Sequence, residues 1–319
     1  MELILLIIYW SIFAASFFGF TLTTGFIIGL WYGQYYYDKS ENTGSRKWIW
    51  LKSILSSCVW IIGKYMFSYK VVMRSQFDND KLELEVKFLL NPSNKNVKVR
   101  VRDELLEEEL VDNFMFAGHP HGLCPISSII FLLLPDSIYS SSLTPFTHRS
   151  VFKWPLIRDL ALWIGALDVC EENIVRTLVT ESIYIVPGGT REILNSYNDT
   201  IQTTHTGFLR VAFNQKKRVY PVIHYGQDKV FLTWKSHYLD VIREMIYDIT
   251  SYPFPTLFLG PIPSPLTTYI LDPVDPSHFK NMTEFIDFYY NQVTSNYKSI
   301  SLEQEKQEEE KRNKKYTST

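Results

Sequence analysis

Strand-like and helix-like stretches alternate between Asn113 and Ile223, and no other feature restricts the fold of this chain as strongly. The strand-like runs cover residues 113–118, 182–186 and 219–224, and the helix-like runs cover residues 124–134, 156–164, 172–180 and 206–214. Alternation of this kind is typical of a sheet that is covered by helices. We therefore predict an α/β fold here, with ligands bound at the carboxyl ends of the strands.

The amino-terminal stretch from Leu3 to Tyr37 contains no charged residue and is rich in aliphatic and aromatic residues. As a single helix it would be roughly 50 Å long, whereas the hydrocarbon core of a bilayer is about 30 Å thick. A tilted transmembrane helix and a shallow hairpin both fit this length. Basic residues follow the stretch while only Glu2 precedes it, which predicts that the rest of the chain faces the cytoplasm.

The composition divides the chain into four regions. These are a transmembrane or hairpin anchor at 1–37, an interfacial apolar segment at 38–69, a cytosolic-facing domain at 70–300 and a charged tail at 301–319, helical or disordered. Inside the domain, we expect ordered loops at 253–276 and a closing helix at 279–297. The net charge of −2 argues against nucleic acid as a partner, and the three widely spaced cysteines predict no metal site.

Two histidines stand at the end of the first strand-like run, in the sequence His119-Pro120-His121-Gly122. Histidine takes up and releases a proton near neutral pH, and glycine lets a ligand approach the main chain. Because this turn follows a strand, it predicts an acid–base site. Cys124 lies three residues after His121 and leaves a thiol nucleophile open, although a cysteine before an apolar helix is more often a small buried residue.

A second polar turn, Pro187-Gly188-Gly189-Thr190-Arg191-Glu192, follows the strand-like run 182–186. Backbone amides at such a turn can bind an anion or a developing oxyanion. Glu192 can orient a histidine or hold a substrate hydroxyl, and it can equally cap the helix that follows. The pattern alone does not choose between these roles.

Several short stretches, in this order and spacing, resemble the type-2 diacylglycerol acyltransferases. Their relatives are the monoacylglycerol and wax-alcohol acyltransferases, within the wider glycerolipid acyltransferase superfamily. The most specific parts are the His-Pro-His-Gly turn and Pro-Gly-Gly-x-x-Glu after a strand. Lys153 to Arg158 with Gly165, Gly207-Phe208 with its helix, and Pro221 to Gly226 also agree. The resemblance covers the hydrophobic amino terminus and roughly residues 113–298.

The resemblance implies a glycerolipid-acyltransferase-like mixed sheet flanked by helices. It also implies transfer of a fatty acyl group from acyl-CoA, as co-substrate, to the free hydroxyl of diacylglycerol, with no metal and no other cofactor. His121 would be the general base, His119 its partner or alternative, and Glu192 the glutamate of the family's Gly-Gly-x-x-Glu segment. The residues that would contact substrate are Pro120, Gly122, Arg158, Gly188, Gly189, Thr190, Arg191, Gly207, Phe208 and Arg210.

This chain departs from the superfamily in the neighbourhood of its histidines. Neither histidine is followed five residues later by an acid, because Cys124 and Ile126 occupy those positions. The His-x4-Asp pairing is therefore absent, and an orienting carboxylate must come from elsewhere in the sequence. Glu192 is our candidate.

The expected partners are acyl-CoA, an acylglycerol or other lipid alcohol, and a membrane. The expected location is the endoplasmic reticulum or another intracellular membrane, or a lipid droplet. Glycines at 25, 29 and 33 permit close helix contact but do not decide whether the chain forms a homo-oligomer. The alternatives are a monoacylglycerol or wax-alcohol acyltransferase, a lipid hydrolase that uses Cys124 and a histidine, and a non-catalytic lipid-droplet protein.

Overall fold

The computed structural model describes residues 15, 19–27, 29–30, 33, 37–74, 113–133, 143–154, 156–194, 201–234, 236–250 and 256–317. Much of the predicted anchor at 1–37 and all of residues 75–112 lie outside these ranges. Within them, we find no helix that has both the length and the apolar character needed to cross a membrane.

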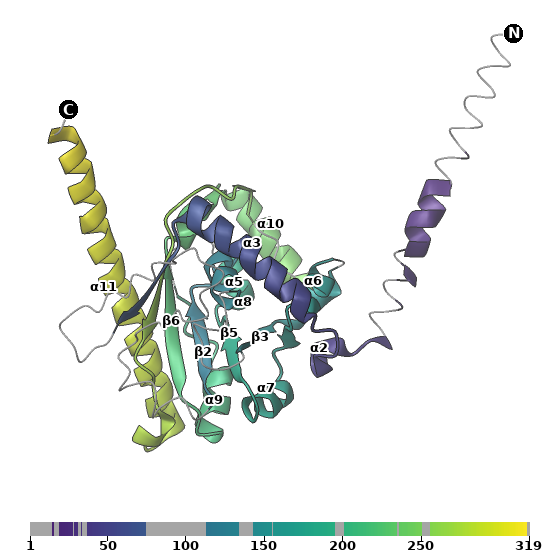
Figure 1. The fold of residues 1–319 in the computed structure, drawn as a ribbon, viewed down its shortest axis with the longest axis horizontal. Coiled ribbons are helices and arrows are strands. Elements are labelled where there is room, and N and C mark those ends of the chain that lie inside the picture. Colours follow the sequence, from purple (N-terminus) through teal and green to yellow (C-terminus); the bar gives the residue numbers. More distant parts are fainter. Residues whose placement is uncertain are drawn as a thin grey trace, which may run out of the picture.

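Seven strands form one mixed sheet in the order β1-β9-β6-β2-β5-β3-β4 (Figure 1). The strands are β1 (Lys70–Arg74), β2 (Met115–His119), β3 (Leu143–Thr147), β4 (Leu167–Asp168), β5 (Ser182–Ile185), β6 (Val219–Tyr225) and β9 (Thr267–Leu271). Neighbouring strands run parallel except for β6 and β9. The α/β class and the mixed sheet flanked by helices are thereby confirmed.

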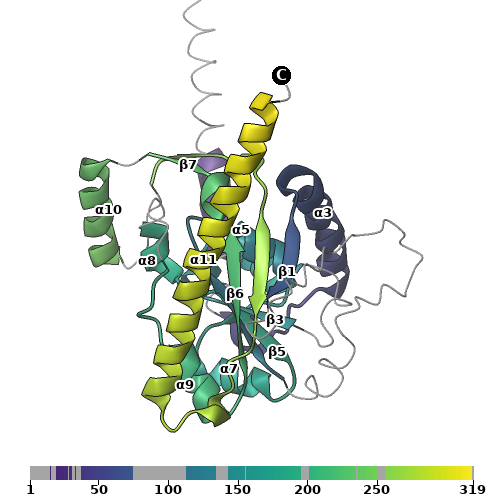
Figure 2. The same cartoon turned by 90° about the vertical axis from the view of Figure 1, so that its left-hand side faces the viewer.

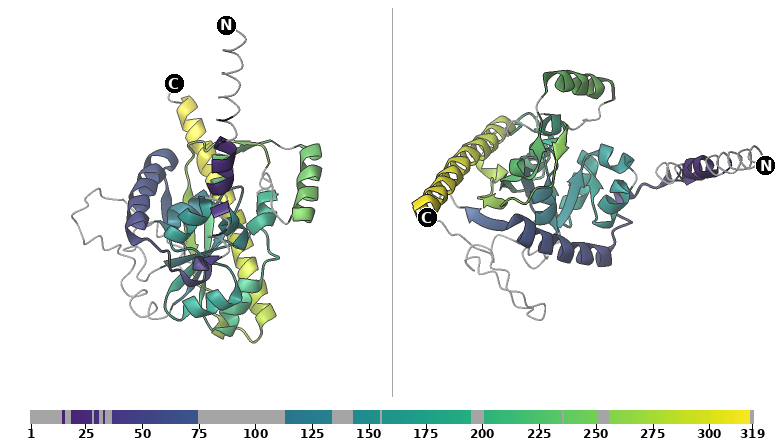
Figure 3. Two further views of the ribbon diagram at one scale, coloured as in Figure 1. Left: turned by 90° about the vertical axis from the view of Figure 1, so that its right-hand side faces the viewer. Right: turned by 90° about the horizontal axis from the view of Figure 1, so that it is seen from above.

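Helices cover both faces of the sheet. One face packs against α7 (Glu171–Leu178), α9 (Gly207–Asn214) and α11 (Met282–Thr317), and the other against α3 (Ile49–Phe67) and α5 (Ile126–Leu132). Seen from above, α11 and α3 lie on different sides of the sheet, and α10 (His237–Thr250) stands out from the body (Figure 3). The other elements are α2 (Ser40–Thr43), α6 (Ile157–Trp163), α8 (Gly189–Leu194), η2 (Arg149–Lys153), η3 (Gln227–Val230), η4 (Pro276–His278), β7 (Leu232–Thr233) and β8 (Phe258–Leu259).

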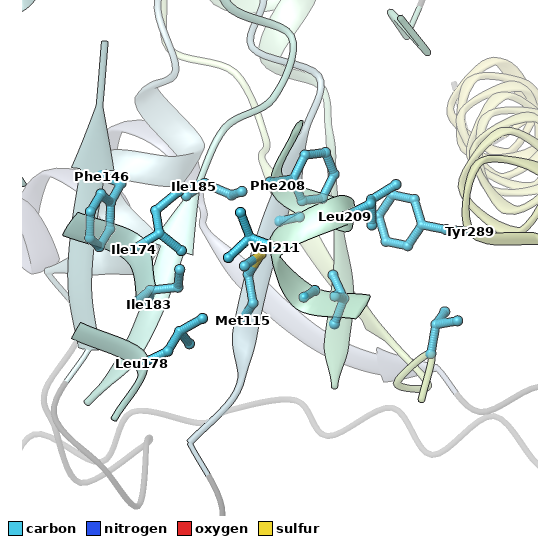
Figure 4. Packing of buried hydrophobic residues seen from close by; sticks show 14 of the residues in the cluster. Met115, Phe146, Ile174, Leu178, Ile183, Ile185, Phe208, Leu209, Val211 and Tyr289 are labelled. Atoms are coloured by element: carbon cyan, nitrogen blue, oxygen red, sulfur yellow. The ribbon is translucent and has the colours of Figure 1, made fainter. Parts of the chain in front are cut away.

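Strand β2 shows why its residues form a central strand. All five of its residues are buried, because successive side chains of a strand point to opposite faces and here both faces are covered. Met115 and Ala117 join the cluster of α7, α9 and α11, whereas Phe116 joins the cluster of α3 and α5. In the first cluster, Met115 and Leu209 pack between the strands and α9, with Tyr289 of α11 beyond (Figure 4).

The carboxyl ends of β2, β5 and β6 lie at one edge of the sheet, because these three strands are parallel. Helices α8 and α10 lie toward this edge, and α7 and α9 lie toward the opposite edge (Figure 2). The elements predicted between residues 113 and 224 are confirmed with small shifts at their ends.

The carboxyl-terminal region differs from the prediction. Strand β9 forms at Thr267–Leu271, where we expected loops, and it pairs with both β1 and β6. Helix α11 joins the predicted closing helix and the charged tail into one element.

Candidate active site

Two polar turns meet at the carboxyl edge of the sheet. His119 ends β2 and is paired with Ile223 of β6, and the His-Pro-His-Gly turn continues from it. Ile185 ends β5 beside Ala117, and the Pro-Gly-Gly turn follows. The sheet register therefore brings together two motifs that are far apart in the sequence.

His119 points into the protein rather than toward solvent. It is 0 % exposed, and its Nε2 lies 3.0 Å from the hydroxyl of Tyr289 in α11. Its Nδ1 is buried without a hydrogen-bond partner among the described residues. Burial lowers the pKa of His119 to about 3, so this imidazole is neutral at physiological pH.

His121 is partly exposed, and one of its two ring nitrogens makes a hydrogen bond. Nδ1 lies 2.9 Å from the carbonyl oxygen of Gly122. A carbonyl only accepts, so Nδ1 carries the proton and Nε2 carries the lone pair. No described residue hydrogen-bonds to that Nε2. Burial lowers the pKa of His121, and the hydrogen bond to Gly122 raises it by less. The ring is therefore neutral at neutral pH, and the lone pair on Nε2 is available.

The side chain of Glu192 contacts the main chain of the His-Pro-His-Gly turn. One carboxylate oxygen accepts a hydrogen bond from the backbone N–H of His121, and the other accepts from the N–H of Gln202 at 2.8 Å. The side chain is buried and folds back over Gly188, where an added Cβ would lie 1.9 Å from the carboxylate. The motif therefore needs glycine at this position because the carboxylate occupies the space of a side chain.

A buried polar network, which the sequence did not reveal, lies on the face of the sheet that packs against α3 and α5. The Nε2 atom of His224 is 2.8 Å from the Tyr184 hydroxyl and 3.0 Å from that of Ser128, and its Nδ1 is 2.8 Å from the hydroxyl of Thr268. Burial lowers the pKa of His224 to about 3. These groups satisfy one another inside the α3 and α5 side of the sheet, so we assign them a structural role.

Several predicted substrate contacts lie away from the turn. Arg158 is 1 % exposed, and its guanidinium contacts Glu41 at 3.0 Å and Asp38 at 3.4 Å. Phe208 is buried and packs against Tyr289. The ion pairs join α6 to the segment around α2, and Phe208 lies in the core. The predicted contacts of Arg158 and Phe208 with substrate stay predictions.

The other predicted contacts lie on the surface or next to Glu192. Arg191 and Arg210 are exposed on α8 and α9, and Gly207 begins α9. Thr190 lies 3.1 Å from the hydroxyl of Tyr247 in α10. Burial and then the charges of Arg191 and His148 lower the pKa of His205.

Two further points concern Cys124 as a nucleophile and the side chains that could bind a metal ion. Burial raises the pKa of Cys124, which keeps the thiol protonated and weakens it as a nucleophile. Among the described residues, no group of three or more histidine, cysteine or acidic side chains is arranged to hold a metal ion.

The chain is similar to several proteins of known function. A family model described as "Diacylglycerol acyltransferase" matches residues 95–260. Diacylglycerol O-acyltransferase 2 of Dictyostelium discoideum is 22 % identical over 285 residues, which cover 82 % of this chain and 76 % of that protein. Diacylglycerol O-acyltransferase 1 of Saccharomyces cerevisiae is 32 % identical over 124 residues, which cover 36 % of this chain and 30 % of that protein.

Among solved structures, the 1-acyl-sn-glycerophosphate (LPA) acyltransferase PlsC of Thermotoga maritima is similar at 13 % identity and a TM-score of 0.47. That likeness covers 86 % of this chain and 89 % of PlsC.

Proposed function

This chain belongs to the diacylglycerol acyltransferase family and is an acyltransferase, and we propose that it moves a fatty acyl group from acyl-CoA to the free hydroxyl of diacylglycerol, forming triacylglycerol. The observation that carries the proposal is the state of His121. Its Nδ1 is held by the carbonyl of Gly122, and its Nε2 keeps a lone pair at the carboxyl edge of the sheet. That arrangement suits a general base for a substrate hydroxyl.

In the proposed reaction, Nε2 of His121 takes the hydroxyl proton as the hydroxyl oxygen attacks the thioester carbonyl. A new C–O bond forms, and the tetrahedral intermediate then breaks its C–S bond. The CoA thiolate leaves and receives the proton from the imidazolium. His119 has no such role in this scheme, because its buried imidazole contacts Tyr289 instead.

Backbone amides near Gly122 and the Gly188-Gly189 pair are the proposed donors to the oxyanion of the intermediate. An added Cβ at Gly189 would meet no atom within 4 Å, so open space adjoins this turn. The exposed guanidinium of Arg191 is the proposed contact for phosphates of CoA. No metal or further cofactor enters this scheme.

The test is an incubation of the full-length protein in membranes with labelled acyl-CoA and a panel of acceptors, followed by separation of the lipid products. We expect triacylglycerol from diacylglycerol to be the main product. A wax ester from a long-chain alcohol would instead show a wax-alcohol acyltransferase, and transfer only to monoacylglycerol would show a monoacylglycerol acyltransferase. Release of free fatty acid without transfer would reject the acyltransferase scheme in favour of hydrolysis.

We also propose that the enzyme works at the surface of the endoplasmic reticulum or another intracellular membrane, with its domain toward the cytoplasm. The uncharged stretch from Leu3 to Tyr37 and the basic residues after it support this orientation. Asn281 lies in a glycosylation sequence and is exposed, so a glycan at this residue would contradict it.

Helix α10 supports contact with lipid. Its inward side is polar, since Arg243 donates to the carbonyl of Leu194 in α8 at 2.8 Å and Tyr247 contacts Thr190. Its outward side carries a stripe of exposed apolar residues at helical spacing, namely Tyr238, Val241, Ile242, Met245 and Ile249. A helix that turns its apolar side outward fits the interface of a bilayer, and α8 with Glu192 lies directly behind it.

Replacing Ile242, Met245 and Ile249 with serine tests this contact. We expect at least a tenfold loss of transfer to diacylglycerol in vesicles, because less apolar surface enters the lipid. Transfer to a short-chain acceptor in detergent should stay unchanged. Serine at Glu244 and Asp248, exposed on the same helix, is the matched control. Equal losses in both variants, or none in either, would contradict lipid contact by this stripe.

A further inference from the structure

Gln227 is a buried amide directly beside the histidine turn, and the sequence patterns did not mark it. It is 4 % exposed and begins η3, two residues after the end of β6. The chain turns sharply here at Gly226, whose φ is +88° and whose added Cβ would lie 2.4 Å from the carbonyl oxygen of Pro265. This turn directs the following side chain under the His-Pro-His-Gly segment.

All three hydrogen bonds of the Gln227 amide go to the main chain around the turn. Its Nε2 donates to the carbonyl oxygen of Pro120 at 3.0 Å and to that of His121 at 2.8 Å. Its Oε1 accepts from the backbone N–H of Ser127, at the start of α5, at 3.1 Å. The partners decide the orientation of the amide, because two carbonyls require donors and an N–H requires an acceptor.

Together with Glu192, this side chain holds His121 from both sides. The carboxylate accepts from the N–H of His121, and the Gln227 amide donates to its carbonyl. With both main-chain groups held, the direction of the Cα–Cβ bond is restricted, and the carbonyl of Gly122 then orients the ring. The ring is thus placed through its backbone, which accounts for the absence of an acid five residues after either histidine.

We infer that Gln227 is a positioning residue for the proton-accepting imidazole of His121. The inference rests on the proposed function in taking His121 as the base. It does not depend on which lipid alcohol is the acceptor.

Replacing Gln227 with leucine keeps the approximate volume and removes all three hydrogen bonds. We expect kcat to fall by about ten- to a hundredfold, with the KM for acyl-CoA within about twofold, because a displaced base slows the chemical step more than binding. The matched control is Gln292→Leu, which removes a buried glutamine whose amide donates to the carbonyl of Asp272, on α11 and away from the turn. This control should keep its kcat.

Gln227→Glu separates positioning from a general loss of stability. A carboxylate would repel the two carbonyls, whereas its protonated form can donate to one of them. The activity of this variant relative to the wild type should therefore rise as the pH falls. The same ratio for Gln227→Leu should not rise as the pH falls, because leucine has no group that can take up a proton and donate it to a carbonyl.

A measurement that needs no turnover completes the test. In the wild type, burial lowers the pKa of His121 below 6.5, and NMR titration of the ring should show that pKa moving toward 6.5 in Gln227→Leu but not in Gln292→Leu. An unchanged kcat in Gln227→Leu, or a ring pKa that does not move, overturns the inference. If the wild type transfers no acyl group at all, the proposed function fails, and the titration still decides whether Gln227 holds the ring.

Discussion

His121→Ala is expected to lower the kcat of acyl transfer by about 10²- to 10⁴-fold, because a general base in hydrogen-bond reach typically contributes that much. The fold should persist, since the hydrogen bond from His121 to Glu192 uses the main chain and survives the substitution. Initial rates with labelled acyl-CoA and diacylglycerol measure the loss. His278→Ala, which removes an exposed histidine in η4, is the control and should keep full activity.

The pH dependence of the wild type tests the role of His121 independently. The folded-state pKa of His121 lies below the usual 6.5, so the base stays neutral as the pH falls to that value and is lost only below it. We therefore expect the acidic limb of kcat/KM to lie below pH 6.5. Full activity in His121→Ala, or an acidic limb well above pH 6.5, would reject His121 as the base.

Of the substitutions considered, Glu192→Ala should lower the free energy of unfolding the most. Two backbone N–H groups, those of His121 and Gln202, would lose a charged acceptor inside the protein. Each such hydrogen bond is worth about 1.5–3 kcal/mol, so the free energy of unfolding should fall by about 3 kcal/mol or more. Activity measured well below the midpoint of unfolding should fall as well, because the His121 turn loses one of its two supports.

Denaturant unfolding of a graded pair of variants tests this prediction. Glu192→Gln keeps one acceptor oxygen and should lie between the wild type and Glu192→Ala. Glu284→Ala, at an exposed glutamate in the first turn of α11, is the control for loss of a carboxylate. If Glu192→Ala unfolds at the same denaturant concentration as Glu284→Ala, the carboxylate does not support the turn.

The strands and helices of the central sheet could be predicted from the sequence because their signals are local. The run 182–186 is mostly apolar and its strand residues are all buried, since both faces of the sheet are covered. Strand β9 was missed because Thr267–Leu271 follows several prolines and its place between β1 and β6 depends on partners far away in the chain.

Tertiary contacts also explain the length of α11. The charged tail has little apolar surface, and its pattern left helix and disorder open. In the structure, Glu303 pairs with Arg74 of β1 at 3.1 Å and Glu308 pairs with Lys229 of η3 at 2.7 Å. Neither partner could be identified from the tail itself.

The candidate site was predicted in part. The two motifs at strand ends were found, and the parallel register places them together. We predicted that Glu192 orients a histidine; its contact is with the backbone of His121 rather than with the ring, and its role stays a prediction. Gln227 was missed because a glutamine after a strand carries no chemical signal until its distant carbonyl partners are known.

The contact between the His121 ring and the carbonyl of Gly122 affects how long a proton can stay on the ring. A carbonyl oxygen carries only a partial negative charge, whereas an acidic partner would carry a full one and would stabilise the imidazolium strongly. An imidazolium held by a carbonyl remains a comparatively strong acid. In the proposed reaction it therefore returns its proton readily to the departing sulfur, so the same ring serves both halves of the transfer and is neutral again for the next acyl-CoA.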